Sequence, residues 1–245
     1  MAVKEQAPAA MPLTDHLREL RSRLVKSVIA FAVGMTVGWI YYSEIFAWIS
    51  APFTDAIAQA RGEGRTITLA LTGVADPFVL QLQIAAVTGL VLSSPIWLYQ
   101  LWRFVTPGLH KHERRWAVGF AAVATPLFAA GVWLAYTVLP YGLTLLLGFT
   151  PDGVENIISV DRYLSFFIRT VIVFGVGFLI PLLLVLLNFA GVLPGRRLLG
   201  WWRWIVIIVI LFAAVATPTG DPINLALLAG PMLVLVAIAV VDERN

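Results

Sequence analysis

The sequence predicts an all-α membrane protein with six transmembrane helices and both termini in the cytoplasm. Three observations support this fold class. Of the 245 residues, 60% are hydrophobic and only 13% are charged, whereas soluble domains are about 45–50% apolar and about 25% charged. The apolar residues gather into stretches that are too long for strands and lack the alternation of a barrel. The lysines and arginines fall mainly on one side of the resulting topology.

The apolar residues define six candidate spans. They run roughly over Leu24–Tyr42, Phe78–Leu101, Trp116–Leu139, Tyr163–Ala190, Trp201–Ala216 and Ile223–Val241. A span needs about 20 apolar residues, so the fifth and sixth are expected to form a short hairpin that thins the bilayer locally. Residues 24–241 would then be one membrane domain, preceded by an amphipathic cytoplasmic segment at 1–23 and followed by a short cytoplasmic tail at 242–245.

The basic residues set the predicted orientation. With both termini inside, thirteen of the 17 lysines and arginines lie in cytoplasmic regions. The four in outer regions are Arg61, Arg65, Arg162 and Arg169. This asymmetry strongly favours cytoplasmic termini in a cell membrane.

The first outer connection, from Ser43 to Pro77, is long. Residues 44–60 carry an apolar side that predicts short helices lying at the membrane interface, with Trp48 as an anchor. Residues 66–71 could be extended. In the second outer connection, from Pro140 to Asp161, Thr150-Pro-Asp-Gly153 indicates a turn.

Two carboxylates near the cytoplasmic face each allow two interpretations. Glu19 lies on an amphipathic segment whose leucines at 13, 17, 20 and 24 share a helical face. It could pair with Arg23 at the i, i+4 spacing on a helix lying at the surface, or join Asp15 in a patch that binds a basic ligand. Glu113 begins the third span, where basic neighbours could neutralise it or a ligand could contact it.

The sequence contains no catalytic signature. There are no cysteines, and no Gly-x-Ser-x-Gly, His-Glu-x-x-His or phosphate-loop motif is present. His110 and His112 beside Glu113 suggest a metal site only weakly. We therefore expect no enzyme, cofactor, metal or nucleic-acid ligand. A small-solute secondary transporter is the alternative, but it would need polar pairs deep in the spans, and only Arg169 approaches that.

Several motifs together resemble the TatC family, the multispanning receptor subunit of the twin-arginine protein translocase. The motifs are His16–Leu24, Ser50–Phe53, Ser93–Arg115, Ser165–Phe167, Phe174–Pro181 and Thr217–Pro222. They occur in TatC order and cover nearly the whole chain.

The resemblance implies a function in protein export. TatC proteins bind the paired arginines of signal peptides on folded cargo, and the matching positions here are Glu19 and Glu113, with Arg21 and Phe104 nearby. Single-span partners of the TatA/TatB type, self-association and the proton-motive force are implied as well. The positions assigned to structure or partner contact are Pro52, Thr217, Asp221 and Asn224.

One position departs from the family pattern. TatC proteins often carry a glutamate or glutamine in the fourth span, where this chain has Leu179. A mechanism that needs a buried acid at this position is therefore in doubt.

Overall fold

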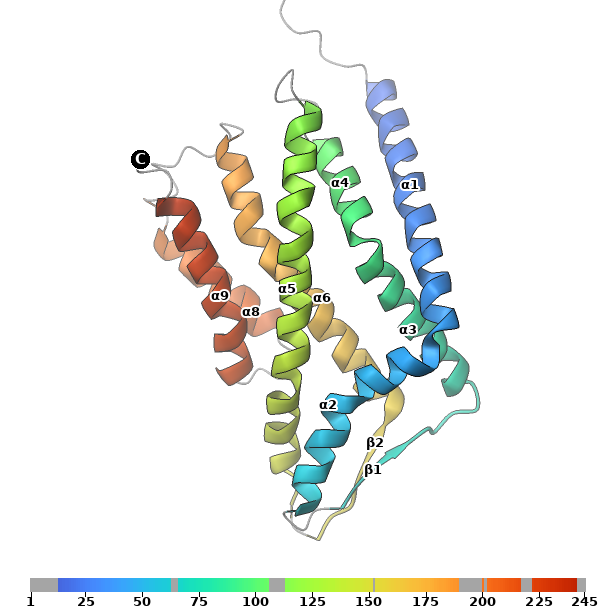
Figure 1. Ribbon diagram of the computed structural model, residues 1–245. Coiled ribbons are helices and arrows are strands. Elements are labelled where there is room, and N and C mark those ends of the chain that lie inside the picture. Colours follow the sequence, from blue (N-terminus) through green and yellow to red (C-terminus); the bar gives the residue numbers. More distant parts are fainter. Residues whose placement is uncertain are drawn as a thin grey trace, which may run out of the picture.

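The computed structural model describes residues 13–62, 66–105, 113–151, 153–189, 200, 202–216 and 222–241, and these are mostly helical (Figure 1). The elements are α1 (Leu13–Ile40), α2 (Tyr42–Gly62), β1 (Ile67–Ala70), α3 (Asp76–Leu92), α4 (Ser94–Val105), α5 (Glu113–Gly148), β2 (Asn156–Ser159), α6 (Val160–Phe189), α8 (Trp202–Ala216) and α9 (Pro222–Val241).

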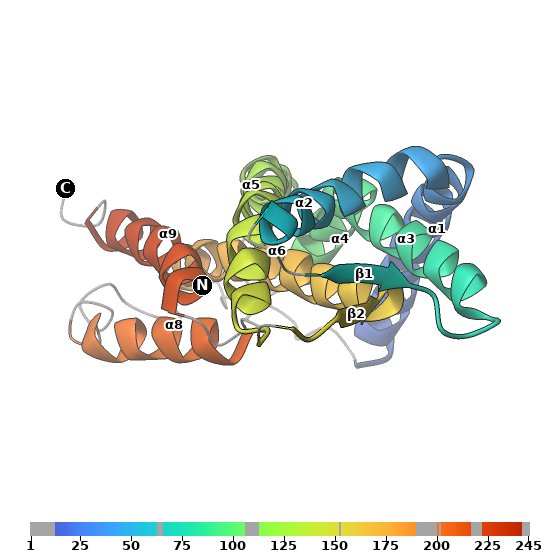
Figure 2. The same ribbon diagram turned by 90° about the horizontal axis from the view of Figure 1, so that it is seen from below.

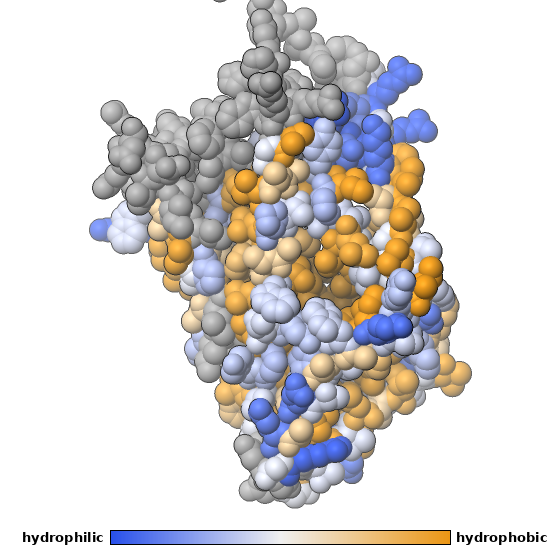
Figure 3. All heavy atoms as spheres, viewed as in Figure 1, coloured by the Kyte–Doolittle hydropathy of each residue, from blue (hydrophilic) through white to orange (hydrophobic). Residues whose placement is uncertain are grey.

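Three helices in the described part of the chain are long and apolar enough to cross a membrane. They occupy Leu17–Ile40 in α1, Val118–Gly148 in α5 and Val160–Leu183 in α6, and the bent pair α3–α4 would make a fourth. Apolar side chains accordingly dominate the middle of the surface, with hydrophilic ones near the start of α1 (Figure 3). The prediction of a helical fold with apolar spans is confirmed, whereas the number six and the orientation of the termini stay predictions.

The second apolar stretch is two helices rather than the single one expected. α3 and α4 meet at Ser93 with a bend of 58°. Pro95 lies in the first turn of α4, where it has no N–H to continue the hydrogen bonds of α3. The indole Nε1 of Trp97 donates to the carbonyl of Leu90 at 3.1 Å, which holds the two helices across the bend. The bend tilts α4 relative to α3.

α1 and α5 are both longer than their apolar stretches. α1 runs unbroken across the expected boundary at residues 23–24, so residues 13–23 continue the helix of the first span instead of forming a separate helix. α5 passes Pro126 and Pro140 and ends at Gly148. A Cβ atom on Gly131 in α5 would lie 2.5 Å from the carbonyl oxygen of Phe174 in α6, so only glycine allows this close approach of the two backbones.

Residues 44–60, predicted as short interfacial helices, lie in the single helix α2, which packs against the protein. Its buried residues include Ile49, Pro52 and Phe53, and the hydroxyl of Tyr163 donates to the carbonyl of Ile49 at 2.6 Å. Trp48 stacks on Tyr136 with ring centroids 4.1 Å apart, although its side chain stays 47% exposed. The apolar side that predicted interfacial helices therefore mainly serves the protein core.

A two-stranded parallel sheet closes the same end of the molecule (Figure 2). β1 pairs with β2 in the register Ile67 to Asn156 and Ala70 to Ser159. β1 was expected as an extended segment, but β2 was not expected. The turn before β2 is present, with Gly153 at φ +78°, a conformation that favours glycine. We call this end, formed by α2, β1, β2 and the adjoining ends of α5 and α6, the sheet end.

Leu179 fills an apolar cluster in the other half of the molecule. Its side chain is 6% exposed and packs with Leu98 and Trp102 of α4 and with Phe120 and Phe128 of α5. The position at which the resemblance implied a polar group is thus part of the packing between α4, α5 and α6 in this chain.

Candidate functional site

A polar cleft of about 510 Å³ opens between α1 and α4. The start of α1 and the end of α4 lie at the end of the molecule opposite the sheet (Figure 1). It is lined by Arg18, Glu19, Ser22, Arg23 and Lys26 of α1 and by Gln100 and Arg103 of α4. The α1 residues are spaced by three and four, so they share one helical face. The bend at Ser93 tilts α4 so that its last turns form the opposite wall.

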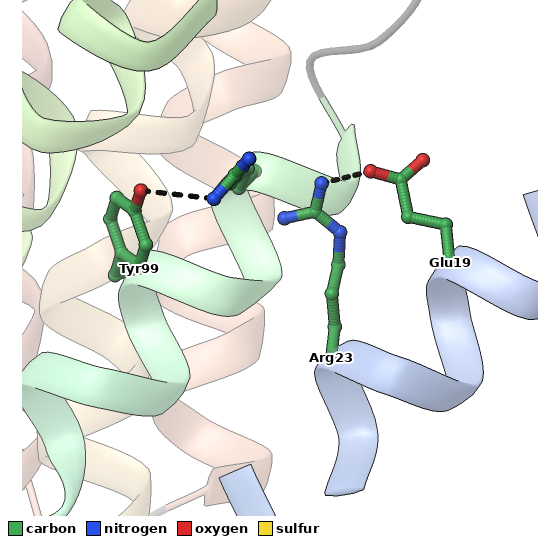
Figure 4. Close-up of polar contacts among 4 residues, drawn as sticks. Glu19, Arg23 and Tyr99 are labelled. Carbon is green, nitrogen blue, oxygen red and sulfur yellow. Dashed lines mark hydrogen bonds and ion pairs between the residues drawn. The ribbon is translucent and has the colours of Figure 1, made fainter. Parts of the chain in front are cut away.

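Glu19 and Arg23 form an ion pair along α1, in which Arg23 Nη2 donates to Glu19 Oε1 (Figure 4). Arg23 is 8% exposed, whereas the Glu19 side chain keeps 30% of its surface accessible. The i, i+4 pairing expected from the sequence is confirmed. Because the carboxylate remains partly exposed in the cleft, the alternative interpretation as a ligand contact is equally compatible with the structure.

The Arg23 guanidinium is incompletely bonded. Its Nε and Nη1 atoms are buried and have no hydrogen-bond partner in the described part of the chain. Across the cleft, Arg103 Nη1 lies 3.5 Å from the hydroxyl oxygen of Tyr99 one turn earlier on α4 (Figure 4). The cleft lining contains four cationic side chains and one carboxylate, so its net charge is strongly positive.

The other predicted site residues lie around this cleft with different outcomes. Arg21 is exposed on α1 and is not part of the cleft lining. Phe104 is half-buried near the end of α4. Glu113 is the first residue of α5, which packs along α4, but its side chain lies outside what the structure describes. Of the predicted binding residues whose side chains the structure describes, Glu19 is the one that lines the cleft.

The residues predicted for partner contact are elsewhere. Pro52 is buried inside α2 at the sheet end. Thr217 and Asp221 lie outside the described residues, and Asn224 is in the first turn of α9 with a side chain that is not described. His110 and His112 are also outside the described residues, and within the described ones no cluster of three acidic or histidine side chains could hold a metal ion.

Sequence reasoning missed that Gln100 and Arg103 line the same cleft as Glu19. They are about eighty residues away along the chain, and they face α1 because the chain bends at Ser93. Their spacing of three, which places both on one face of a helix, was the available signal. Nothing in the spacing of α4 alone says which helix that face meets.

Comparison with known proteins identifies the family of this chain. The chain matches the family described as Sec-independent protein translocase protein (TatC) over residues 15–231. It is 42% identical over 236 residues to a Sec-independent protein translocase protein TatC of Frankia casuarinae, covering 94% of this chain and 65% of that relative. A TatC of Xylanimonas cellulosilytica is 39% identical, with 92% of this chain and 80% of the relative covered. The chain therefore spans about two thirds of the Frankia relative's length.

The fold is also similar to solved structures. A crystal structure of the twin-arginine translocase receptor TatC superposes with a TM-score of 0.74 at 31% identity, covering 93% of this chain and 98% of that one. A second crystal structure of the receptor gives the same TM-score at 32% identity, with 94% and 98% covered. From its sequence and its fold, this chain belongs to the TatC family of Sec-independent protein translocase proteins.

Proposed function

We propose that this protein binds the twin-arginine signal peptides of folded cargo at the cytoplasmic face and nucleates the translocase that exports them. The observation that carries this proposal is Glu19, a partly exposed carboxylate in an open cleft, in a chain that matches the TatC family over most of its length. The role is one of binding and assembly, without catalysis, and the proton-motive force would supply the energy.

The chemistry of Glu19 suits an arginine ligand. A carboxylate receives the planar guanidinium with two parallel hydrogen bonds, which lysine cannot supply. Glu19 is already bonded to Arg23, but a partly exposed ion pair of this kind contributes only about 0–1 kcal/mol. A signal-peptide arginine could therefore replace Arg23 as the partner of Glu19.

A second carboxylate is required for a ligand with two positive charges. Glu19 faces four cationic side chains in the cleft, so by itself it would not hold two further arginines against their repulsion. α5 begins at Glu113 and packs against α4, and on this basis we assign Glu113 as the second carboxylate of the proposed site. Arg21 and Phe104, just outside the cleft, would contact neighbouring parts of the peptide.

The site is tested with a labelled twin-arginine peptide and its twin-lysine counterpart, using purified protein in neutral detergent. We expect the lysine peptide, Glu19→Gln and Glu113→Gln each to weaken binding about tenfold, as loss of a charged hydrogen bond implies. The double variant should lose less binding free energy than the two single variants lose together, if one peptide bridges both carboxylates. Glu44→Gln, on an exposed carboxylate in the first turn of α2, is the control and should bind normally. Unchanged affinity in the double variant would refute the site.

For the membrane arrangement we propose six spans with both termini in the cytoplasm. The basic residues support this, because thirteen of 17 lie on the proposed inner side. A cysteine at Gly62, next to the sheet, should react with an impermeant thiol reagent from outside, and a cysteine at Ser22 should not. Both positions are exposed, so accessibility is matched. The reverse labelling would overturn the orientation.

We further propose that α8 and α9 dock a single-span partner of the TatA/TatB type, alongside self-association of this chain. The apolar side chains of Trp204, Ile208 and Leu211 on α8 are all more than half exposed. Thr217, Asp221 and Asn224, in or next to the α8–α9 connection, would supply polar contacts. A photocrosslinker at Leu211 should capture a small membrane protein in native membranes. The control is Val33 on α1, similarly exposed; equal capture there would count against the assignment.

A further inference from the structure

The cleft between α1 and α4 contains a buried cation that lacks acceptors. Arg23 is more than nine-tenths buried, yet Nε and Nη1 have no hydrogen-bond partner in the described part of the chain. Buried charged groups in folded proteins are normally bonded, because an unpaired one loses its hydration without compensation. The two nitrogen atoms therefore still have the capacity to bond an acceptor beyond those that the described residues supply.

The positive charge of the cleft favours an anionic ligand. Arg18, Lys26 and Arg103 line it together with Arg23, against the single carboxylate of Glu19. The cleft volume of about 510 Å³ accommodates a tetrahedral group with several acceptor oxygens. A phosphate or phosphodiester matches both the charge and the number of donors, and the hydroxyl of Ser22 and the amide of Gln100 are available for neutral parts of the ligand.

The apolar surface next to the cleft favours a lipid as the source of this anion. On the same face of α1, three and seven residues after Lys26, the side chains of Ile29 and Val33 are both more than half exposed, and they belong to a segment long and apolar enough to span a membrane. A headgroup in the cleft would therefore have its acyl chains along an apolar helix face. Basic pockets between helices at a membrane surface bind anionic headgroups in this way.

We propose that the cleft binds the phosphodiester of an anionic phospholipid, with Arg23 as the central donor and Arg18, Lys26 and Arg103 around it. This site does not depend on the twin-arginine function, because it uses the cations of the cleft and not its carboxylate. It also accounts for four cationic side chains gathered around one glutamate, an arrangement that would otherwise be repulsive.

The test measures lipid binding to the purified full chain in neutral detergent by native mass spectrometry. The probes are dioctanoyl phosphatidylglycerol, zwitterionic dioctanoyl phosphatidylcholine and inorganic phosphate. We expect phosphatidylglycerol to bind most tightly, and Arg18→Gln with Arg103→Gln to weaken it about tenfold. Arg23→Gln should weaken phosphatidylglycerol binding at least as much. If the Arg23 variant does not fold, the variant with both Arg18→Gln and Arg103→Gln provides the test, because both of these arginines are exposed.

Arg203→Gln provides the matched control. Arg203 is exposed near the start of α8 and lies over Trp202, so the variant removes a basic charge without touching the cleft, and phosphatidylglycerol binding should stay unchanged. Equal loss in this control, or equal binding of phosphatidylcholine, would overturn the proposal. Inorganic phosphate binding as tightly as phosphatidylglycerol would show an anion site without lipid and would overturn the lipid assignment.

Discussion

The sheet end and the cleft end of this molecule are built in opposite ways. At the sheet end, Phe53 is 1% exposed and Ile67 is fully buried, and the buried hydroxyl of Tyr163 finds a backbone carbonyl at 2.6 Å. At the cleft end, the buried guanidinium of Arg23 bonds only through Nη2 within the described part of the chain. The sheet end is closely packed and its buried tyrosine hydroxyl is hydrogen-bonded. The cleft end is charged and open, and its buried arginine is incompletely bonded.

The two ends therefore differ in whether their groups stabilise the fold or remain available to a ligand. Packed apolar groups and paired polar groups stabilise a fold and leave nothing for a ligand to improve. A cleft with exchangeable ion pairs contributes little to the fold, but its groups can be bonded by a signal peptide or a headgroup. Substitutions at the packed positions should therefore change stability, and those in the cleft should change binding.

The largest loss of stability is expected at Leu179, in the apolar cluster between α4, α5 and α6. Leu179→Glu would place a carboxyl group among Leu98, Trp102 and Phe128. We expect about 3 kcal/mol of destabilisation, because a charged group in the interior of a spanning segment is costly, measured by thermal unfolding in detergent. Leu179→Met is the volume-conserving control and should cost less than about 1.5 kcal/mol. A stable glutamate variant would show that water or a counter-ion reaches this position.

The next effect concerns the contact between α5 and α6. Gly131→Ala would bring a methyl group to 2.5 Å from the carbonyl oxygen of Phe174, and separating the helices should cost about 2 kcal/mol. Gly119→Ala on the same helix has no atom within 4 Å and should leave the unfolding temperature unchanged. If both variants lower the unfolding temperature equally, the destabilisation comes from α5 itself and not from its contact with α6.

A smaller effect is expected at the hydrogen bond between α6 and α2. Tyr163→Phe removes the donor to Ile49 and leaves a buried carbonyl with one acceptor site unused, which should cost about 1 kcal/mol. Tyr141→Phe is the control, since Tyr141 is 69% exposed. Peptide binding at the cleft should be unaffected by either change. A loss of peptide affinity in Tyr163→Phe would show that the two ends are coupled.

The smallest effect on stability is expected in the cleft. Arg23→Met removes a buried, incompletely bonded charge and fills the same space, and Glu19 remains hydrated because its side chain is 30% exposed. The free energy of unfolding should therefore change by less than about 1 kcal/mol. Twin-arginine peptide should bind several-fold more tightly, because Arg23 no longer competes for Glu19. A destabilisation comparable to that of Gly131→Ala would contradict the contrast between the two ends.

The amino-acid sequence was sufficient to predict the class of the fold and the ion pair between Glu19 and Arg23. Apolar stretches of sufficient length specify helices because in lipid the backbone must bond within itself, and the described helices lie within or around every predicted stretch. The spacing of Glu19 and Arg23 fixed their ion pair, since side chains four apart on a helix are neighbours. The motifs that resemble TatC correctly indicated the family.

The contacts between distant helices and strands, in contrast, became visible only in the three-dimensional structure. The bend at Ser93, the packing of α2 on the protein and the pairing of β1 with β2 bring together residues distant in the sequence, and local periodicity carries no information about such partners. The same reason explains the cleft, because Gln100 and Arg103 face Glu19 only after α4 has turned toward α1. Leu179 likewise became interpretable only when Leu98 and Phe128 were found around it.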